Sequence, residues 1–229
     1  MILSPSLLSS DFSNLTFELN KLEEAGITWL HLDIMDGAFV PNITFGPPVM
    51  AALRPKSRLF FDVHLMIEDP ARYLLEFKAA GADLLIVHAE ADRHLERTLT
   101  KIRDLGLKSG LAFNPGTDLN CLEWVAHALD FVLIMGVNPG FSGQKFIPTT
   151  YAKVKCCRQL LDEYNPGQVL IGVDGGVDLS NAGDLVRAGA DVLVSGSAFF
   201  GHKDYVEAKK LFDAACPTPP RIKIQDWLG

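Results

Sequence analysis

The feature that most constrains the fold of this chain is a short phrase that recurs along it. A glycine ends an amphipathic stretch and a run of branched aliphatic residues follows, at 25–28, 80–83, 105–108 and 188–191. Glycine accepts the left-handed backbone conformation that ends many helices, and a strand that is aliphatic throughout is typically buried on both faces. The repeat therefore predicts helices that alternate with buried strands.

The same alternation continues over most of the chain and predicts eight strands. They are expected near residues 2–8, 28–35, 59–66, 83–88, 108–113, 131–136, 168–174 and 191–195, and a helical pattern follows nearly every one. Strands that alternate with helices form right-handed crossovers and a parallel sheet. Eight such units indicate an α/β fold, a single (β/α)8 TIM barrel, which typically takes about 250 residues. An open, doubly wound sheet is the competing architecture, but no GxGxxG follows an early strand.

The chain shows no linker and no break in composition over its 229 residues. We therefore expect one barrel domain over 1–229, with 216–229 as a C-terminal extension. The ending CPTPPRIKIQDWLG is interrupted by prolines and is expected to lie outside the last helix. In the first helix, Leu15, Leu19 and Leu22 share one side, and Ser10 is the expected N-cap.

Composition and charge narrow the classes of partner. The net charge is −7 and no run of lysine and arginine occurs, which argues against a broad nucleic-acid surface. No apolar stretch approaches membrane-spanning length, and the N-terminal residues lack the features of a signal or transit peptide. The four cysteines show no CxxC spacing, which is typical of free thiols in a reducing compartment. We expect a cytoplasmic protein with no nucleic-acid or membrane partner.

Polar side chains interrupt three of the predicted strands near their carboxyl ends. The segment WLHLDIMDG carries His31 and Asp33 on one face, because side chains alternate along a strand. His64 lies in the next strand, FDVHLMI, and Asp174 ends the seventh. In a barrel these strand ends surround one mouth, which is where such folds carry their active sites. Two imidazoles and two carboxylates form a mixed set of nitrogen and oxygen donors that suits a divalent cation.

Each of these polar positions also has a purely structural interpretation. A lone strand histidine is commonly a satisfied core residue, and an aspartate at a strand end commonly caps a helix or forms a turn. Asp36, which precedes Gly37, suits a turn, and Asp62 suits a partner that orients an imidazole. Three methionines near the same strand ends could be gap-filling core residues: Met35, Met66 and Met135.

Two glycine-bearing turns follow the seventh and eighth predicted strands. They read VDGGVDLSNAG (173–183) and VSGSAFF (194–200). Glycine lets the backbone approach a ligand closely, and the amides at a helix start suit phosphate. Loops at these two places form the usual phosphate site of barrels. A longer segment after the sixth strand, NPGFSGQKF (138–146), has the length of a mobile lid, although it could be a plain surface loop.

These segments together carry a resemblance to a known family. The chain closely resembles the ribulose-phosphate 3-epimerases, metal-dependent (β/α)8 enzymes of pentose phosphate metabolism. The resemblance runs from about residue 4 to about residue 200 and rests on SPSLLSSDF, HLDIMDGAFVPNITFGP, DVHLMI, VNPGFSGQKFIP, VDGGV and VSGSA, in that order. It implies an isomerase that interconverts D-ribulose 5-phosphate and D-xylulose 5-phosphate. It also implies a phosphorylated ketose as substrate and assembly into a homo-oligomer.

The resemblance further implies a role for individual residues. One divalent cation per subunit would be bound by His31, Asp33, His64 and Asp174. Asp33 and Asp174 would also be the two acid/base groups, one on each face of the substrate. The substrate would contact Ser6, His64, Met35, Met66, Met135, Gly140, Phe141, Ser142 and Gly143. The phosphate would lie against Gly175, Gly176, Gly196 and Ser197. The donor set admits Zn, Fe, Mn or Co, and the sequence does not select among them.

The chain departs from the family pattern in the predicted lid and in the tail. Ser142 stands where a second glycine is common, as in GFGGQ, and its side chain could stiffen the lid or add a hydroxyl contact. The proline-rich ending of this chain is also unlike the usual ending of the family. Neither departure touches the predicted metal ligands.

Three other functions are compatible with parts of the pattern. A 3-epimerase of a related hexulose 6-phosphate would have nearly the same pocket. Phosphate-binding barrel decarboxylases of the orotidine-phosphate type resemble the second strand, but they have a lysine two positions after the aspartate, where this chain has Met35. A non-catalytic barrel would have no need for a paired acid and base such as Asp33 and Asp174.

Overall fold

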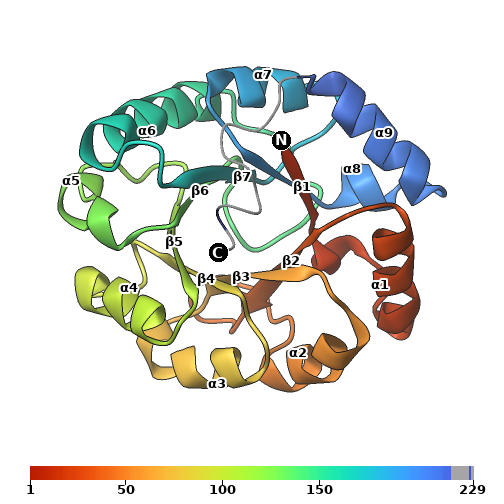
Figure 1. Cartoon of the computed structure of the whole chain (residues 1–229), viewed down its shortest axis with the longest axis horizontal. Helices are drawn as coiled ribbons and strands as arrows, with labels where there is room; N and C mark the ends of the chain where they lie inside the picture. Colours follow the sequence, from red (N-terminus) through yellow and green to blue (C-terminus); the bar gives the residue numbers. More distant parts are fainter. Residues whose placement is uncertain (218–226, 228–229) are drawn as a thin grey trace.

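The structure is a closed ring of eight parallel strands surrounded by helices. The chain is described here by a computed structural model, which covers residues 1–217 and residue 227. The strands follow the order β1-β8-β7-β6-β5-β4-β3-β2 in one sheet, and a parallel bridge between Ser6 and His31 joins β1 to β2. Viewed along the barrel, the strands encircle the axis and the helices lie outside them (Figure 1). The fold is the (β/α)8 TIM barrel that the alternation predicted.

The observed strands match the predicted ones closely. They are β1 (Ile2–Pro5), β2 (Trp29–Met35), β3 (Phe60–Met66), β4 (Leu84–His88), β5 (Lys108–Phe113), β6 (Phe131–Met135), β7 (Leu170–Asp174) and β8 (Val192–Ser195). Only β1 has a boundary that differs from the predicted one by more than two residues. It ends at Pro5 because Leu7–Ser9 form a short 3-10 helix.

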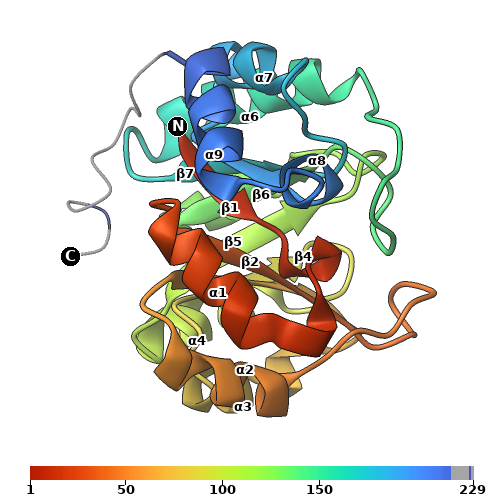
Figure 2. The same ribbon diagram turned by 90° about the vertical axis from the view of Figure 1, so that its right-hand side faces the viewer.

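Helices of uneven length cover the outside of the barrel. They are α1 (Leu15–Glu24), α2 (Pro47–Leu53), α3 (Leu74–Ala79), α4 (Leu95–Asp104), α5 (Leu122–Val125), α6 (Thr150–Tyr164), α7 (Ala182–Ala188), α8 (Ser197–Phe200) and α9 (Tyr205–Ala215). The helix after the second strand, α2, has 7 residues. The long connections at 36–46 and 136–149 leave from the carboxyl ends of β2 and β6, and both project from the same end of the molecule (Figure 2).

The four glycines of the recurring phrase end helices as predicted. Gly26, Gly81, Gly106 and Gly189 have φ values of 74°, 92°, 77° and 120°. A side chain is strained in this left-handed region, which is why glycine serves there. The repeat seen in the sequence is therefore a repeat of one local conformation.

The predicted N-cap of the first helix is wrong. Ser10 donates its hydroxyl to the carbonyl of Leu7, 2.8 Å away, and so caps the end of the preceding 3-10 turn instead. Asp11 caps the 3-10 segment 12–14, because its carboxylate accepts from the backbone N–H of Ser13 at 2.9 Å. The N-cap position of α1 itself is Asn14, whose side chain makes no capping hydrogen bond. Two capping residues follow each other here, and the aspartate serves the helical segment that leads into α1.

The interior of the barrel is filled with large apolar side chains. Trp29, at the amino end of β2, stacks on Phe60 with ring centroids 4.4 Å apart. The Trp227 ring lies 5.4 Å from the Trp29 ring, and the Lys108 ammonium lies 4.8 Å from the Trp227 ring centroid. One described residue of the predicted C-terminal extension thus packs against the amino end of the barrel. Residues 218–226 and 228–229 of that extension lie outside the described residues.

All four cysteines are free thiols: Cys121, Cys156, Cys157 and Cys216. Among residues 1–217 and 227, no helix is both long enough and apolar enough to cross a membrane.

Candidate active site and metal centre

Three strand ends bring the four predicted metal ligands together. His31 and Asp33 come from β2, His64 from β3 and Asp174 from β7. Their ligand atoms all lie within 4.8 Å of one another. His31 and His64 are completely buried, and Asp33 is nearly so. Segments more than a hundred residues apart in sequence thus form one compact polar cluster inside an apolar barrel.

The donor atoms are spaced as the ligands of one small cation would be. His31 Nε2 lies 3.4 Å from His64 Nδ1 and 3.3 Å from Asp33 Oδ1. Asp174 Oδ2 lies 3.9 Å from His31 Nε2 and 3.8 Å from His64 Nδ1. Ligands bound at about 2.1 Å in a tetrahedron lie roughly 3.4 Å apart. The cluster therefore fits a divalent transition metal.

Neighbouring side chains hold two of these ligands in place. His31 Nδ1 donates to Asp62 Oδ2 at 2.9 Å, which leaves the lone pair of Nε2 for a ligand. Asp62 is thus the orienting partner that one interpretation of the sequence expected. Ser6 donates its hydroxyl to Asp33 Oδ2 at 2.5 Å, so Asp33 Oδ1 faces the histidines.

The cluster favours positive charge at its centre. Burial opposes protonation of His31, but the carboxylates of Asp62 and Asp33 raise its pKa well above the usual range. Burial lowers the pKa of His64, which keeps that imidazole neutral with a lone pair to offer. A cation in the cluster would therefore replace a proton that the same carboxylates already attract.

The two aspartates have opposite pKa shifts. Burial alone would raise the pKa of Asp33, but His31 and His64 outweigh it and hold this pKa well below its usual value. Burial and the neighbouring charge of Asp33 raise the pKa of Asp174 to about 7. Near neutral pH one carboxylate is ionised and the other holds a proton for much of the time. Carboxylates whose environments separate their pKa values in this way are suited to act as base and acid.

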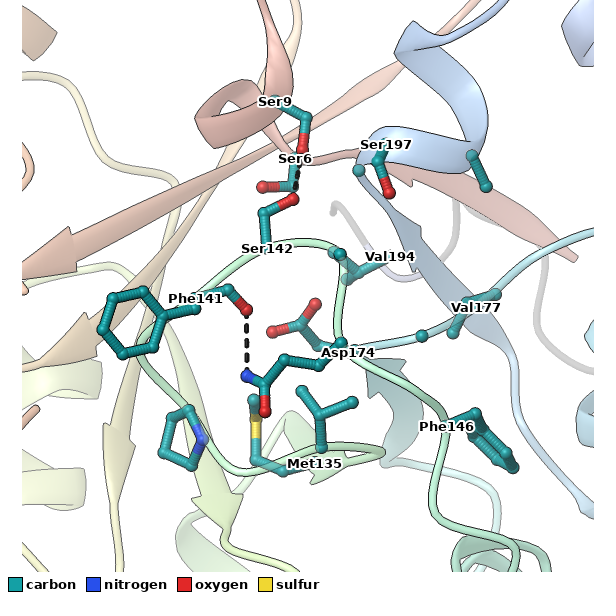
Figure 3. A pocket seen from close by; sticks show the side chains of 18 of the residues that line it. Ser6, Ser9, Met135, Phe141, Ser142, Phe146, Asp174, Val177, Val194 and Ser197 are labelled. Carbon is teal, nitrogen blue, oxygen red and sulfur yellow. Dashed lines mark hydrogen bonds between the residues drawn. The ribbon is translucent and has the colours of Figure 1, made fainter.

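A cavity of about 460 Å³ opens above the cluster. Asp33 and Asp174 contribute to its wall, whereas His31 and His64 lie beneath it. Ser6, Asp174 and Ser197 point into it (Figure 3). The other predicted site residues line it too: Met35, Met66, Met135, Gly140, Phe141, Ser142, Gly143, Gly175, Gly176 and Gly196. His64 was also predicted to contact the substrate, and it is not among the lining residues.

The three methionines form an apolar part of the cavity wall. Met35 and Met66 are paired in the β2–β3 register, and Met135 is paired with Asp174 in the β6–β7 register. All three are buried, so they also fill the core, as the structural interpretation held. The two interpretations are compatible, because each thioether reaches the cavity from a packed strand end.

The predicted phosphate turn after β7 comes close to the base of the predicted lid. Gly175 has φ 102°, and a Cβ there would lie 2.4 Å from a Val137 side-chain carbon. Gly176 has φ 67°, and a Cβ there would lie 2.8 Å from the Phe146 backbone. Both positions therefore need glycine for their backbone conformation and for this close approach.

The segment 138–146 is held over the cavity by two contacts with other loops. Ser142 Oγ lies 2.9 Å from Ser9 Oγ (Figure 3), and Asn42 Nδ2 donates to the carbonyl of Gly140 at 2.9 Å. The Phe141 ring is about half exposed. The segment is thus a cover over the site and not a plain surface loop, and Ser142 adds a hydroxyl contact to another loop.

Sequence reasoning missed two residues beside the cluster. His88 ends β4, and its Nε2 lies 2.8 Å from His64 Nε2, while its Nδ1 lies 3.1 Å from Glu90. The signal was present, because a histidine ends the aliphatic run LLIVH. Asp36, in contrast, is the turn former that the structural interpretation expected, since its carboxylate accepts from the N–H groups of Ala38 and Phe39.

Comparison with known families shows where this site belongs. The Ribulose-phosphate 3 epimerase family profile matches residues 2–200. The chain belongs to the ribulose-phosphate 3-epimerase family. The ribulose-phosphate 3-epimerase of Synechocystis sp. is 48% identical over 210 residues, which cover 91% of each chain. That of Bacillus subtilis is 48% identical over 205 residues, which cover 90% of this chain and 94% of the relative. The protein is an isomerase of the epimerase class, and a phosphorylated sugar fits it as substrate.

Solved structures with a similar barrel include enzymes of other chemistry. A 3-hexulose-6-phosphate synthase is 21% identical with a TM-score of 0.63, covering 94% of this chain and 100% of that one. The orotidine 5'-phosphate decarboxylase of Pyrococcus horikoshii is 19% identical with a TM-score of 0.66, covering 94% and 99%. At these identities the likeness shows the fold alone.

Proposed function

We propose that this chain interconverts D-ribulose 5-phosphate and D-xylulose 5-phosphate by moving protons at carbon 3 with two opposed carboxylates. The observation that carries the proposal is the pair Asp33 and Asp174. They lie near the carboxyl ends of separate strands, β2 and β7, line one cavity and have pKa values shifted in opposite directions. Inversion of a carbon beside a ketone needs a base on one face and an acid on the other, and the family membership supplies the substrate class.

Which aspartate acts as the base and which as the acid would depend on the direction of the reaction. With one sugar bound, ionised Asp33 first removes the carbon 3 proton, and Asp174 then delivers its proton to the opposite face. The sugar passes through an enediolate between these two transfers. In the reverse direction Asp174 begins as the base, so the two groups titrate as a coupled pair.

His31, Asp33, His64 and Asp174 would hold one divalent cation, which the donor set and the donor spacing support. Such an ion, when bound, supplies Lewis-acid stabilisation of negative charge on the sugar oxygens. The residues of the chain do the remaining work: Asp62 and Ser6 orient two of the ligands, and the buried methionines exclude water from the reacting carbons.

The rest of the cavity would bind the phosphate and close over the sugar. Gly175, Gly176, Gly196 and Ser197 would lie against the phosphate at the turns after β7 and β8. The segment 138–146 would cover the sugar during proton transfer. Assembly into homo-oligomers and a cytoplasmic location stay predictions.

Solvent deuterium tests the proposal directly. Metal-replete protein is incubated with ribulose 5-phosphate in heavy water, and label at carbon 3 is followed by NMR. We expect label to enter carbon 3 as xylulose 5-phosphate forms. Absence of both label and product would leave a non-catalytic barrel. A comparison of kcat/KM for pentulose and hexulose phosphates decides between this substrate and a hexulose 6-phosphate.

A further inference from the structure

A continuous line of hydrogen bonds leads from the candidate ligand His64 away from the cavity. His64 Nε2 lies 2.8 Å from His88 Nε2, and His88 Nδ1 lies 3.1 Å from Glu90 Oε2. Both imidazoles are completely buried. Their ring centroids lie 4.9 Å apart with 27° between the planes, so with nitrogens at 2.8 Å the rings meet edge to edge. That arrangement directs an N–H of one ring at the lone pair of the other.

The far end of this line is an anion that only accepts hydrogen bonds. Glu90 Oε1 accepts from the backbone N–H of Asn114 at 2.9 Å and from the hydroxyl of Thr117. Burial opposes ionisation of Glu90, but the bonds from His88, Thr117 and Asn114 outweigh it and lower its pKa to about 2. A carboxylate with these donors around it requires a proton on the facing nitrogen, His88 Nδ1.

The proton on His88 Nδ1 determines which ring nitrogen of His64 carries its proton. With its proton on Nδ1, neutral His88 offers a lone pair at Nε2. His64 must then carry its proton on Nε2 in order to donate, and its Nδ1 keeps a lone pair. His64 Nδ1 is the atom that faces Asp33 Oδ1, 3.3 Å away, in the candidate metal cluster. The opposite tautomer of His64 would aim an N–H at the cation and prevent binding.

The two histidines of the cluster are oriented by different means. Asp62 accepts directly from His31 Nδ1, so His31 binds through Nε2. At His64 Nε2 the partner is His88 in place of a carboxylate. Glu90 fixes the proton of His88 on Nδ1, and His88 Nε2 therefore accepts from His64 Nε2. Neither His88 nor Glu90 is among the described residues that line the cavity, which separates them from residues that touch the sugar.

We propose that His88 and Glu90 are positioning residues that lock His64 in the tautomer whose Nδ1 binds the divalent cation. This inference rests on the proposed function in one respect, the presence of a cation in the cluster. It assigns to the HAE sequence at 88–90 a role in metal affinity, exerted through His64. Partners that orient a metal-binding histidine typically contribute about 10- to 100-fold in metal affinity or activity.

Metal affinity and histidine tautomers test the proposal together. Zinc and cobalt affinities are measured by competition with a chelator for the parent protein and for E90Q and H88L. We expect both variants to bind about 10- to 100-fold more weakly, because the amide introduced by E90Q can present an N–H to His88 and the aliphatic side chain introduced by H88L cannot accept from His64. H88Q keeps an acceptor oxygen and is expected to retain most of the affinity, which also controls for misfolding at this buried position. Circular dichroism establishes that each variant folds.

The chain provides a matched control pair on its surface. His127 and Glu96 form an exposed histidine–carboxylate pair with Nε2 and Oε1 3.6 Å apart. H127L and E96Q make the same chemical changes far from the cluster, and neither is expected to alter metal affinity.

A metal-independent measurement reads the tautomer itself. Long-range proton–nitrogen correlation spectra of metal-free protein are expected to show His64 protonated on Nε2 in the parent and shifted away from that form in E90Q. If the parent protein binds no cation, the metal centre of the proposed function is wrong. The spectra of metal-free protein would still show which nitrogen of His64 carries the proton. Tight binding by the parent with unchanged affinity in folded E90Q and H88L, or a parent His64 protonated on Nδ1, would overturn this inference.

Discussion

Asp33 and Asp174 show how the surroundings give two chemically identical side chains opposite pKa shifts. Asp33 faces two imidazoles and accepts from the Ser6 hydroxyl, so its charge is stabilised. Asp174 is desolvated beside the charge of Asp33, so its proton is retained. The difference comes from the neighbours alone, and it prepares one group to accept a proton and the other to deliver one.

Asp33→Asn and Asp174→Asn are each expected to abolish turnover. General acid–base groups typically contribute about 10²- to 10⁴-fold, and each aspartate is in addition a candidate ligand. The measurement is kcat together with the metal content of each purified variant. A variant with full metal content and near-normal epimerisation would contradict the two-base scheme.

The raised pKa of Asp174 predicts a pH dependence of stability in metal-free protein. The folded pKa is about 7 and the ordinary value is 3.8, so between these values the folded state holds a proton that the unfolded state has lost. The contribution of this group is therefore present below pH 4 and is lost as the pH rises through 7. Urea unfolding of the parent and D174N at pH 4 to 8 measures it. We expect the stability of D174N relative to the parent to increase over this window, and a constant difference would contradict the shift.

At the scale of elements, the register of β2 against β3 brings together three of the four candidate metal ligands, His31, Asp33 and His64. The register pairs His31 with Asp62, Asp33 with His64 and Met35 with Met66. Each pair joins side chains on the same face, because both strands alternate in step. A shift by one residue would turn these groups outward, so the apolar residues between them, which pack against helices, also hold the site in place.

The cover over the cavity is joined to a neighbouring segment by one pair of hydroxyl groups. Ser142 and Ser9 join the segment 138–146 to the loop after β1, with hydroxyl oxygens 2.9 Å apart. Ser142→Gly removes this bond and is expected to raise KM for the sugar phosphate about two- to tenfold without lowering kcat, since one hydrogen bond contributes about 0.5–1.5 kcal/mol.

Steady-state kinetics of S142G, of Ser9→Ala and of the double variant measure the coupling between these two hydroxyls. The double variant is expected to match the single ones, because either change removes the same bond. If the effects of the two single changes on KM add fully in the double variant, or if only kcat falls, the hydrogen bond between Ser142 and Ser9 does not help to hold the segment 138–146 over the sugar.

At the scale of the whole molecule, the two ends of the barrel have different tasks. The carboxyl end carries the cluster, the cavity and the long loops, whereas the amino end is filled by Trp29, Phe60 and Trp227. Trp227 is almost completely buried although it lies near the end of the sequence. It therefore extends the core at the end of the barrel opposite the site.

Trp227→Ala is expected to lower the free energy of unfolding by up to about 3 kcal/mol while kcat and KM stay unchanged, because the lost packing lies far from the cavity. Chemical denaturation and steady-state kinetics measure the two effects. Trp124, which is 70% exposed, provides the control: Trp124→Ala makes the same change without core packing. Equal stability of the two variants would contradict the role of Trp227 in the core.

Several particulars of the fold and the site could be predicted from the sequence, and others could not. The helix-ending glycines and the polar strand ends could be predicted because each depends on only a few neighbouring residues. The predicted N-cap at Ser10 was wrong because two short 3-10 turns, 7–9 and 12–14, precede α1, whose N-cap position is Asn14. The contact of His88 with His64 went unnoticed because β4 shows no alternation of polar residues, only a histidine at its end.

The sequence by itself determined the alternation of strands and helices, the end of the barrel that carries polar groups and the four side chains proposed as metal ligands. Periodicity and residue type are local properties, and a parallel barrel brings the carboxyl ends of its strands to one rim. Only the tertiary structure decided the spacing of the donors, the opposite pKa shifts of Asp33 and Asp174, the line from His64 to Glu90 and the place of Trp227. These depend on desolvation and on atoms from distant segments within a few ångströms, which arise only when the closed barrel forms.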